Sequence, residues 1–198
     1  MTRDPIALPT NLQQGSIAPL YRWSLDRYHQ AVAAGIFDGQ PLELLDGQLI
    51  EMAPEGIPHA GLSSDGADYL REQLSDRAKV REGKPITLPN DSEPEPDIAI
   101  VKPLGDRYKT ERHPNVADIF WVIEYANTSL EKDLQLKTRI YGNAKIPEYW
   151  VVNLRTRELV IFREPVEDGY QSRQVMTDGL VYPVSFPAIA LQVTKLVA

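Results

Sequence analysis

The sequence predicts an α/β protein with a mixed central β-sheet that is flanked by helices and carries extra β-hairpins. Three observations indicate this class. Helical and strand patterns alternate in the middle of the chain, hairpin patterns occur towards both ends, and residues 118–126, DIFWVIEYA, form a nearly continuous apolar run. Such a run is typical of a central strand that is covered on both faces. Alternating helices and strands predict a sheet with helices packed against it.

Size and composition favour one globular domain after a short tail. The chain has 198 residues, of which 42% are hydrophobic, and this is ordinary for a domain that closes a single core. Residues 1–20 are rich in Pro, Asn and Gln and show no apolar period, so we expect a tail or an arm that reaches a partner subunit. We therefore expect the globular domain to cover residues 21–198.

Charge and cysteine content narrow the function classes. The formal net charge of −7 counts against a general nucleic-acid-binding role, because such proteins usually present a basic surface. A local basic face is still compatible with this total, and a metal site concentrates carboxylates. The chain has no cysteine, which argues against disulfides, thiolate metal sites and a cysteine nucleophile. Any metal would be held by oxygen or imidazole.

The sequence shows no targeting or membrane segment. Its start, MTRDPIALPTNLQQGS, lacks the basic flank and the apolar stretch of a secretory signal. No later segment approaches the ~20 apolar residues of a membrane span. We therefore expect a cytoplasmic protein.

Three helices are expected. Ser24 is a good N-cap for a helix of about ten residues that ends near Gly35. Apolar residues recur at helical spacing from about 59 to 78, which predicts an amphipathic helix. Thr128 and Glu131 have the spacing of a capping box, which predicts a third helix that runs through about residue 144.

The strands are bounded by turn residues. Asp46-Gly47 between two short apolar runs is the strongest short-range signal for a two-residue hairpin turn. Pro147 prevents the third helix from continuing, so the chain returns as a strand after it. The expected strands cover 42–45, 48–52, 79–88, 96–101, 118–126, 148–154, 158–164 and 170–176, and a terminal apolar segment covers 183–193.

Two carboxylates are placed to share a divalent cation. Asp97 follows a proline and opens a strand, and Glu124 lies late in the neighbouring strand, in a run where an unpaired charge is costly. Magnesium prefers hard oxygen ligands and usually takes one or two carboxylates with water and substrate phosphate. The pair therefore fits a Mg²⁺ site, for which Mn²⁺ is an expected substitute. Because an Asp after Pro is common in turns, Asp97 alone also has a structural interpretation.

Lys137 is expected to face the sheet from the third helix. Residues at helical spacing share its face, namely Asp133, Ile140, Tyr141 and Ala144. A lysine near two carboxylates would orient the attacking water of phosphodiester hydrolysis and offset the charge of the transition state. Alternatively, Lys137 only pairs with Asp133 on a solvated face.

Other hydrolytic and nucleotide-binding chemistries lack their motifs. There is no G-x-S-x-G elbow, and the three histidines, His29, His59 and His113, do not have the spacing of zinc ligands. No Gly-rich phosphate loop is present, which argues against a nucleotide-triphosphate motor. Cleavage would need only metal and water.

An ordered set of motifs extends from about residue 42 to 154. The motifs are LELLDGQLIEMAP, His59, SEPEPDIAIV, WVIEYANTS, DLQLKTRIY and IPEYWVVNL. In this order they resemble the Uma-two family of restriction-endonuclease-like proteins, within the PD-(D/E)XK nuclease superfamily. The resemblance implies a restriction-endonuclease-like core sheet that carries the two acidic residues of the superfamily at Asp97 and Glu124.

The resemblance also implies a displaced lysine. The superfamily motif has its lysine two residues after the Glu, where this chain has Ala126, and the family's lysine matches Lys137 on the following helix, with Lys132 as a weaker match. The segment after Glu124 departs from the family, since Tyr-Ala-Asn-Thr-Ser replaces an apolar pair and Ser-Pro-Ser-Thr. This change touches the loop beside the metal. Lys145 stands where the family commonly has a helix-ending Gly.

Three further residues match family positions. Glu43 could add a carboxylate to the metal site, or it is an exposed strand residue. His59 could contact substrate, or it caps or packs at the helix start. Tyr141 lies one turn beyond Lys137, where its hydroxyl could hold the lysine or a phosphate, or it only packs in the core.

The first functional hypothesis is a Mg²⁺-dependent endonuclease that cleaves DNA, acting as a homodimer because an isologous pair lets two sites reach two strands. A second is a non-enzymatic scaffold or regulatory module of the same fold, which the acidic charge and the altered loop favour. A third is a hydrolase of another phosphodiester such as RNA. A basic stripe is expected along Arg71, Arg77, Lys79, Arg81 and Lys84 as the surface that contacts phosphates.

Overall fold

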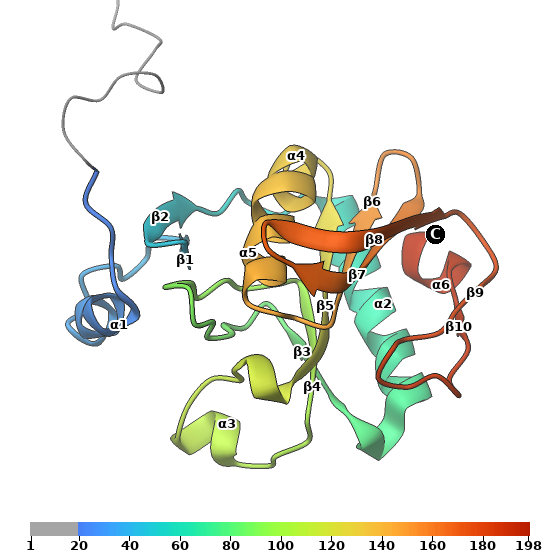
Figure 1. Cartoon of the computed structure of the whole chain (residues 1–198), viewed down its shortest axis with the longest axis horizontal. Helices are drawn as coiled ribbons and strands as arrows, with labels where there is room; N and C mark the ends of the chain where they lie inside the picture. Colours follow the sequence, from blue (N-terminus) through green and yellow to red (C-terminus); the bar gives the residue numbers. More distant parts are fainter. Residues whose placement is uncertain (1–19) are drawn as a thin grey trace, which may run out of the picture.

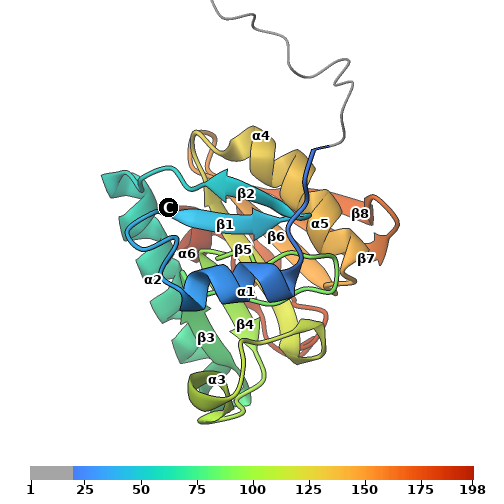
Figure 2. The same cartoon turned by 90° about the vertical axis from the view of Figure 1, so that its left-hand side faces the viewer.

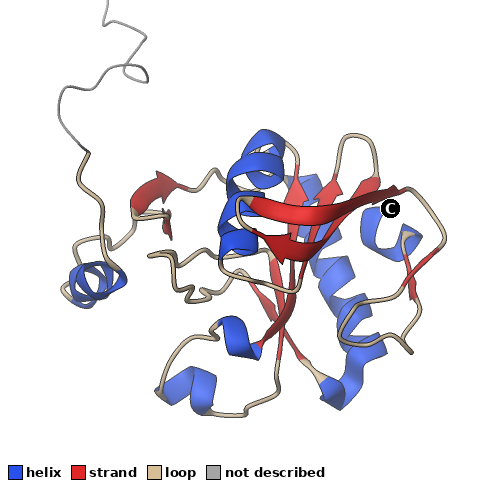
Figure 3. Ribbon diagram, in the orientation of Figure 1, coloured by secondary structure: helices blue, strands red, loops and turns tan. Residues whose placement is uncertain are grey.

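The computed structural model describes residues 20–198 (Figure 1). The tail expected over residues 1–20 lies almost entirely outside the described residues. A six-stranded sheet forms the centre, with helices on both of its faces (Figure 3). The predicted fold class, a mixed sheet flanked by helices, is therefore confirmed. Within the described part of the chain, no helix is long and apolar enough to cross a membrane.

The sheet has the strand order β3-β4-β5-β6-β7-β8. Its strands are β3 Lys79–Glu82, β4 Ile98–Val101, β5 Ile119–Ala126, β6 Glu148–Asn153, β7 Glu158–Val166 and β8 Gly169–Met176. Only the β5–β6 pair is parallel, and every other pair in this sheet is antiparallel. The chain crosses over between β5 and β6 through a helical segment, as expected for a parallel pair.

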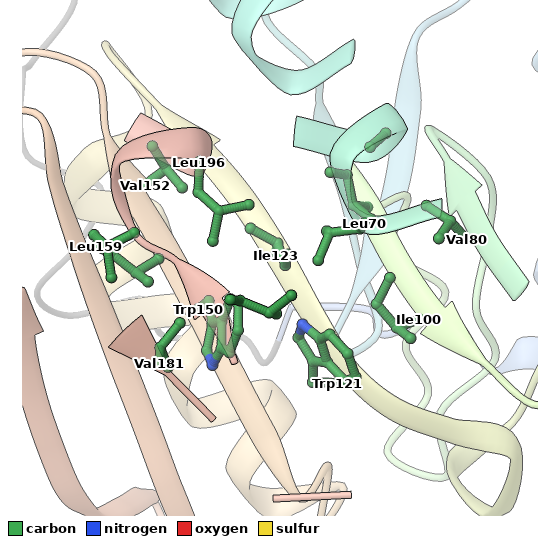
Figure 4. Packing of buried hydrophobic residues seen from close by; sticks show 14 of the residues in the cluster. Leu70, Val80, Ile100, Trp121, Ile123, Trp150, Val152, Leu159, Val181 and Leu196 are labelled. Carbon is green, nitrogen blue, oxygen red and sulfur yellow. The ribbon is translucent and has the colours of Figure 1, made fainter. Parts of the chain in front are cut away.

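One face of the sheet is covered by α2, Ile57–Leu74, and by the short C-terminal helix α6, Thr194–Val197 (Figure 1). Figure 4 shows the core between them, where Leu70 and Leu196 pack against Trp121, Ile123 and Trp150 of the sheet. Gly66 lets α2 approach the sheet closely, because a Cβ there would lie 2.0 Å from the Tyr125 hydroxyl oxygen. This contact fixes the middle of α2 beside the end of β5.

The other face is covered by one irregular helix. It consists of α4 Leu130–Lys132, a π-helical turn at Asp133–Lys137 and α5 Thr138–Asn143. The hairpin of β1 Leu42–Leu45 and β2 Gln48–Glu51 lies beside it, with α1 Leu25–Ala33 further out (Figure 2). The second core cluster lies on this face of the sheet.

The remaining elements are short, and some of them pack against the sheet. They are the 3₁₀ turns Ser75–Arg77 and Val116–Asp118, α3 Arg107–Thr110, β9 Leu180–Val181 and β10 Leu191–Gln192. Strands β9 and β10 pair with each other near the C-terminus.

Local signals placed several elements correctly. The Ser24 hydroxyl oxygen accepts from the Arg27 amide, 3.4 Å away, at the start of α1. Asp46 and Gly47 both have positive φ, at 50° and 72°, which is the conformation of a type I′ hairpin turn. The apolar run 118–126 is the buried strand β5 near the middle of the sheet.

Some boundaries differ from expectation. The capping box at Thr128 and Glu131 is wrong, because the third helix begins after Ser129 without a side-chain cap. Helix α2 begins and ends earlier than predicted, since its last turn tightens into the 3₁₀ turn at 75–77. Thr87 and Leu88 form isolated bridges rather than the end of a strand, because Gly83 takes a positive φ and β3 ends before it.

Candidate active site

Asp97 and Glu124 face each other at one end of two neighbouring strands. Strands β4 and β5 are antiparallel, and their register pairs Ile98 with Ile123, so one step further brings Asp97 opposite Glu124. Glu124 lies two residues from both Val122 and Ala126, so it points to the same face of the sheet as they do, the face covered by α5. The Tyr125 amide donates to Asp97 Oδ2 at 2.6 Å and ties the two strand ends together.

Lys137 and Tyr141 approach Glu124 from the helical segment. Lys137 Nζ lies 2.8 Å from Glu124 Oε1, and the Tyr141 hydroxyl donates to the same oxygen at 2.8 Å. Both side chains are buried, as the predicted helix face requires. The π turn carries Asp133 and Lys137 at its two ends and directs both into the protein. Such turns often occur at functional sites.

Glu43 reaches the same cluster from the hairpin. It accepts from Lys132 Nζ at 2.9 Å through Oε1, and its Oε2 lies 3.4 Å from Lys137 Nζ. The side chain is only 1% exposed, so the interpretation of Glu43 as an exposed strand residue is wrong. Glu43 Oε2 is buried and accepts no hydrogen bond from the described residues.

His59 bridges two carboxylates at the start of α2. Its Nε2 lies 3.0 Å from Asp97 Oδ2, and its Nδ1 lies 3.5 Å from Glu55 Oε2. This hydrogen bond to Asp97 raises the pKa of His59 to about 9. Helix α2 instead has Gly56 as its N-cap, so His59 does not cap the helix.

The cluster contains more carboxylate than cation. Burial, together with the neighbouring Asp97, Asp133 and Glu43, raises the pKa of Glu124 to about 8 although Lys137 opposes the shift. Burial alone would lower the pKa of Lys137, but Glu124, Glu43 and Asp133 hold it above its usual value. Burial alone would raise the pKa of Glu43, but Lys137 and Lys132 hold it below its usual value. Lys137 is therefore charged, and several carboxyl groups share its charge.

The cluster lines a cleft of about 520 Å³. Asp97, Glu124 and Lys137 lie on one wall, and Pro41 and Met52 belong to an apolar part of the lining. The other lining residues come from loops and from the ends of neighbouring helices and strands, namely Glu43, Ala53, Pro54, Glu55, Gly56, His59, Gly83, Glu95, Tyr125, Asn127, Thr128, Ser129, Lys132 and Asp133.

The donor set fits a hard divalent cation. Asp97 accepts both of its hydrogen bonds through Oδ2, and Glu124 accepts both of its through Oε1. The other oxygen of each carboxylate has no hydrogen-bond donor among residues 20–198, and the buried Glu43 Oε2 lacks one as well. Oxygen ligands are what Mg²⁺ or Mn²⁺ requires. A second donor group, Glu55, His59 and Asp97, has ligand atoms within 4.8 Å of one another and shares Asp97.

Comparison with known proteins supports the same class. The profile of a family described as "Putative restriction endonuclease" (Uma2) matches residues 25–194. The chain belongs to this family. The Uma2 match confirms the resemblance seen in the sequence motifs, and it assigns the chain to restriction-endonuclease-like nucleases, which are hydrolases of nucleic acid.

A solved structure is also similar to this chain. It is described as a "putative nuclease belonging to DUF820 from Anabaena variabilis ATCC 29413". The superposition has a TM-score of 0.58 at 18% identity and covers 78% of this chain and 88% of the other chain. At this identity the similarity supports the fold. No curated protein matches this chain.

The structure of the Uma2 chain gathers every site residue that the sequence predicted. Asp97, Glu124, Lys137, Glu43 and His59 line one cleft, and Tyr141 contacts Glu124 from beneath it.

The sequence reasoning missed Glu55 and undervalued Lys132. Glu55 stands four residues before His59, and this i, i+4 spacing is the only local signal that links them. Lys132 pairs with Glu43 across 89 residues of sequence, a contact for which no local pattern exists.

Within the expected basic stripe the three arginines have local partners, whereas Lys84 is exposed, and contact of the stripe with phosphate stays a prediction. Arg71 pairs with Asp68 and Glu82, and Arg77 donates to backbone carbonyls at the end of α2. Arg81 is half-buried against the Tyr108 ring, and burial lowers the pKa of Arg81. The arginines of this stripe therefore stabilise the fold.

Proposed function

We propose that this protein is a Mg²⁺-dependent endonuclease that hydrolyses the phosphodiester backbone of DNA. The observation that carries the proposal is the position of Lys137, whose Nζ lies 2.8 Å from Glu124 Oε1 at the base of an open cleft. Asp97 stands opposite Glu124 at the ends of the same two strands. Carboxylates and a lysine in one cleft are the groups that hydrolysis of a phosphodiester requires.

Asp97 and Glu124 would hold the divalent cation, with Glu43 as a third carboxylate close by. Each of the three has an oxygen atom that accepts no hydrogen bond from the described residues. When bound, the cation offsets the charge of the phosphate and lowers the pKa of a water molecule. Mn²⁺ has the same ligand preference for oxygen and is expected to substitute.

Lys137 would orient the attacking water and offset negative charge in the transition state. Its pKa lies above the ordinary value, so the side chain is a permanent donor at neutral pH. Glu43 and Glu124 hold its ammonium group in place from two different elements. Ala126 leaves room for this arrangement, because it faces the same side of β5 as Glu124 and carries no functional group.

Tyr141 and His59 would act through the carboxylates that they contact. The Tyr141 hydroxyl orients Glu124, and His59 orients Asp97 so that Oδ1 is left for the cation. Groups that hydrogen-bond to metal ligands commonly change metal affinity by about 10- to 100-fold when removed. Direct contacts of His59 and Tyr141 with substrate stay predictions.

Cleavage of supercoiled plasmid with Mg²⁺ or Mn²⁺ tests the proposal. We expect the wild type to nick or linearise the plasmid, and we expect Asp97→Asn, Glu124→Gln and Lys137→Met to lose this activity while they stay folded. Glu95→Gln is the matched control, because Glu95 lines the same cleft and burial raises the pKa of its carboxyl towards the neutral form. Loss of activity in the control as well would contradict the assignment of roles.

The alternatives give different results in the same assay. Cleavage of RNA alone would identify the substrate as another phosphodiester. No cleavage of any nucleic acid, together with no metal binding, would identify a scaffold or regulatory module. A homodimer, a cytoplasmic location and the limits of the domain at 21–198 stay predictions, of which the first is tested by light scattering on the purified chain.

A further inference from the structure

A second hollow adjoins the catalytic cleft on the outer surface of the α4–α5 segment. It encloses about 570 Å³ and is lined by Thr128, Glu131, Lys132, Gln135, Leu136 and Arg139. Thr128 and Lys132 line the cleft as well. The two hollows therefore adjoin at Thr128 and Lys132.

The π turn separates the side chains that serve the cleft from those that line the hollow. Asp133 and Lys137 point into the protein, whereas Lys132, Gln135 and Arg139 lie on the outer face. Their spacing of i, i+3 and i+7 places them along one side of the helix. Lys132 and Arg139 are separated by about 10 Å along the helix axis.

Arg22 extends this row of cations. Arg139 Nη2 lies 4.0 Å from Asp46 Oδ2, and Arg22 Nη1 lies 2.8 Å from the same oxygen. Both arginines are about half exposed, with 49% and 57% of their side-chain surface accessible. In Figure 2 the chain that leads into α1 passes beside α5, in agreement with these contacts. Lys132, Arg139 and Arg22 are called the phosphate track below.

Two acidic groups oppose the phosphate track. Glu131 lines the hollow and lies 3.5 Å from Gln135 Nε2, and Asp46 stands between the two arginines. Among the cations, Lys132 forms an ion pair with Glu43, but its side chain is 27% exposed and lines both hollows. The track is therefore weakly basic, which is consistent with an overall charge of −7.

We propose that the phosphate track binds the backbone of the DNA strand on one side of the bond that is cleaved. Exposed arginines bind phosphate oxygens through two parallel hydrogen bonds, which fixes the register of a strand without reading its sequence. The track adjoins the cleft, so a strand bound along it delivers a phosphate to Asp97 and Glu124. This inference rests on the proposed function, and its binding test is independent of catalysis.

Fluorescence anisotropy with a labelled DNA duplex of about 24 base pairs tests the track. The whole chain carries Glu124→Gln in every sample, so that the duplex is not cut. We expect Arg139→Ala and Arg22→Ala each to weaken binding about fivefold and to reduce the salt slope by about 1, as loss of one phosphate contact does. Glu131→Gln is expected to tighten binding by a similar factor, because it removes an opposing charge.

The matched control is Arg155→Ala, which removes an exposed arginine from the β6–β7 turn, outside both hollows. Equal affinity of the Arg139, Arg22 and Arg155 variants would overturn the phosphate track, and so would the absence of any binding. Cleavage by the chain with intact Glu124 separates the two proposals. Loss of binding in the track variants without any cleavage would support the track and contradict the nuclease.

Discussion

Two buried glutamates on neighbouring strands, Glu148 and Glu124, differ in their hydrogen-bond partners. Glu148 on β6 accepts from Trp150 Nε1 and Arg163 Nε through Oε1, and from the Val184 amide through Oε2. Glu124 on β5 faces the opposite side of the sheet, where it shares the single cation Lys137 with Glu43 and Asp133. Only the second group opens to a cleft. A buried carboxylate whose oxygens both accept hydrogen bonds serves the fold. One with an oxygen that accepts no hydrogen bond can still bind a ligand.

The largest expected effect is on activity. Glu124→Gln should lower the cleavage rate by about 10²- to 10³-fold, the range found when one group that stabilises a transition state is removed. The melting temperature should stay about the same, because the amide oxygen still accepts from Lys137 and Tyr141. Plasmid nicking and thermal melts measure both. A large loss of stability would make Glu124 a structural residue like Glu148.

At Glu148 we expect a loss of stability without a loss of activity. Arg163→Met leaves the fully buried Glu148 without its cation and should destabilise the protein by about 3 kcal/mol, as broken buried pairs do. Urea denaturation measures this change. Cleavage per folded molecule should be unchanged, because Arg163 contacts the opposite face of the sheet from Glu124. Adding Glu148→Gln should recover part of the stability.

The sequence predicts the residues around Glu124 on the strand and on the following helix, because these depend on local patterns. Glu124 interrupts an apolar strand, and helical spacing puts Asp133, Lys137 and Tyr141 on one face. What sequence could not give are contacts between distant segments. The partners of Asp97 and Glu43 are His59 and Lys132, at 38 and 89 residues of separation. The role of Glu148 was missed for the same reason.

The group of cations on the outer face of the α4–α5 segment could not be predicted from the sequence either. The basic residues that sequence grouped together, such as Arg71 and Arg81, are held by local partners. Arg22 and Arg139 are 117 residues apart in the chain and meet only because both approach Asp46. The π turn, which separates inward from outward side chains, has no signature in the sequence.

An intermediate effect is expected at His59, through the orientation of Asp97. His59→Ala should weaken Mn²⁺ binding by about 10- to 100-fold, the usual range for a group that holds a metal ligand. His59→Gln keeps an N–H donor and should recover part of this affinity. Calorimetric titration of the folded variants measures it. Glu55→Gln is the control, and an equal loss there would instead favour the Glu55, His59 and Asp97 group as the cation site.

The smallest effect lies outside both glutamate groups and concerns stability alone. Lys145 has a φ of 63°, a left-handed conformation that costs a non-glycine residue about 1 kcal/mol. Lys145→Gly should therefore stabilise the protein by about that amount in urea denaturation. Lys145→Ala, which removes the charge but keeps the strain, should have little effect. Neither change should alter cleavage.

The central claim is that Asp97 and Glu124, with Glu43 close by, bind a divalent cation, whereas the group around Glu148 serves only the fold. Calorimetric titration of Mn²⁺ into the wild type and the folded Asp97→Asn and Glu124→Gln variants tests this most directly. We predict binding by the wild type that is lost or greatly weakened in both variants and unchanged in Arg163→Met. Absence of binding by the wild type, or equal binding by all four proteins, would contradict the account.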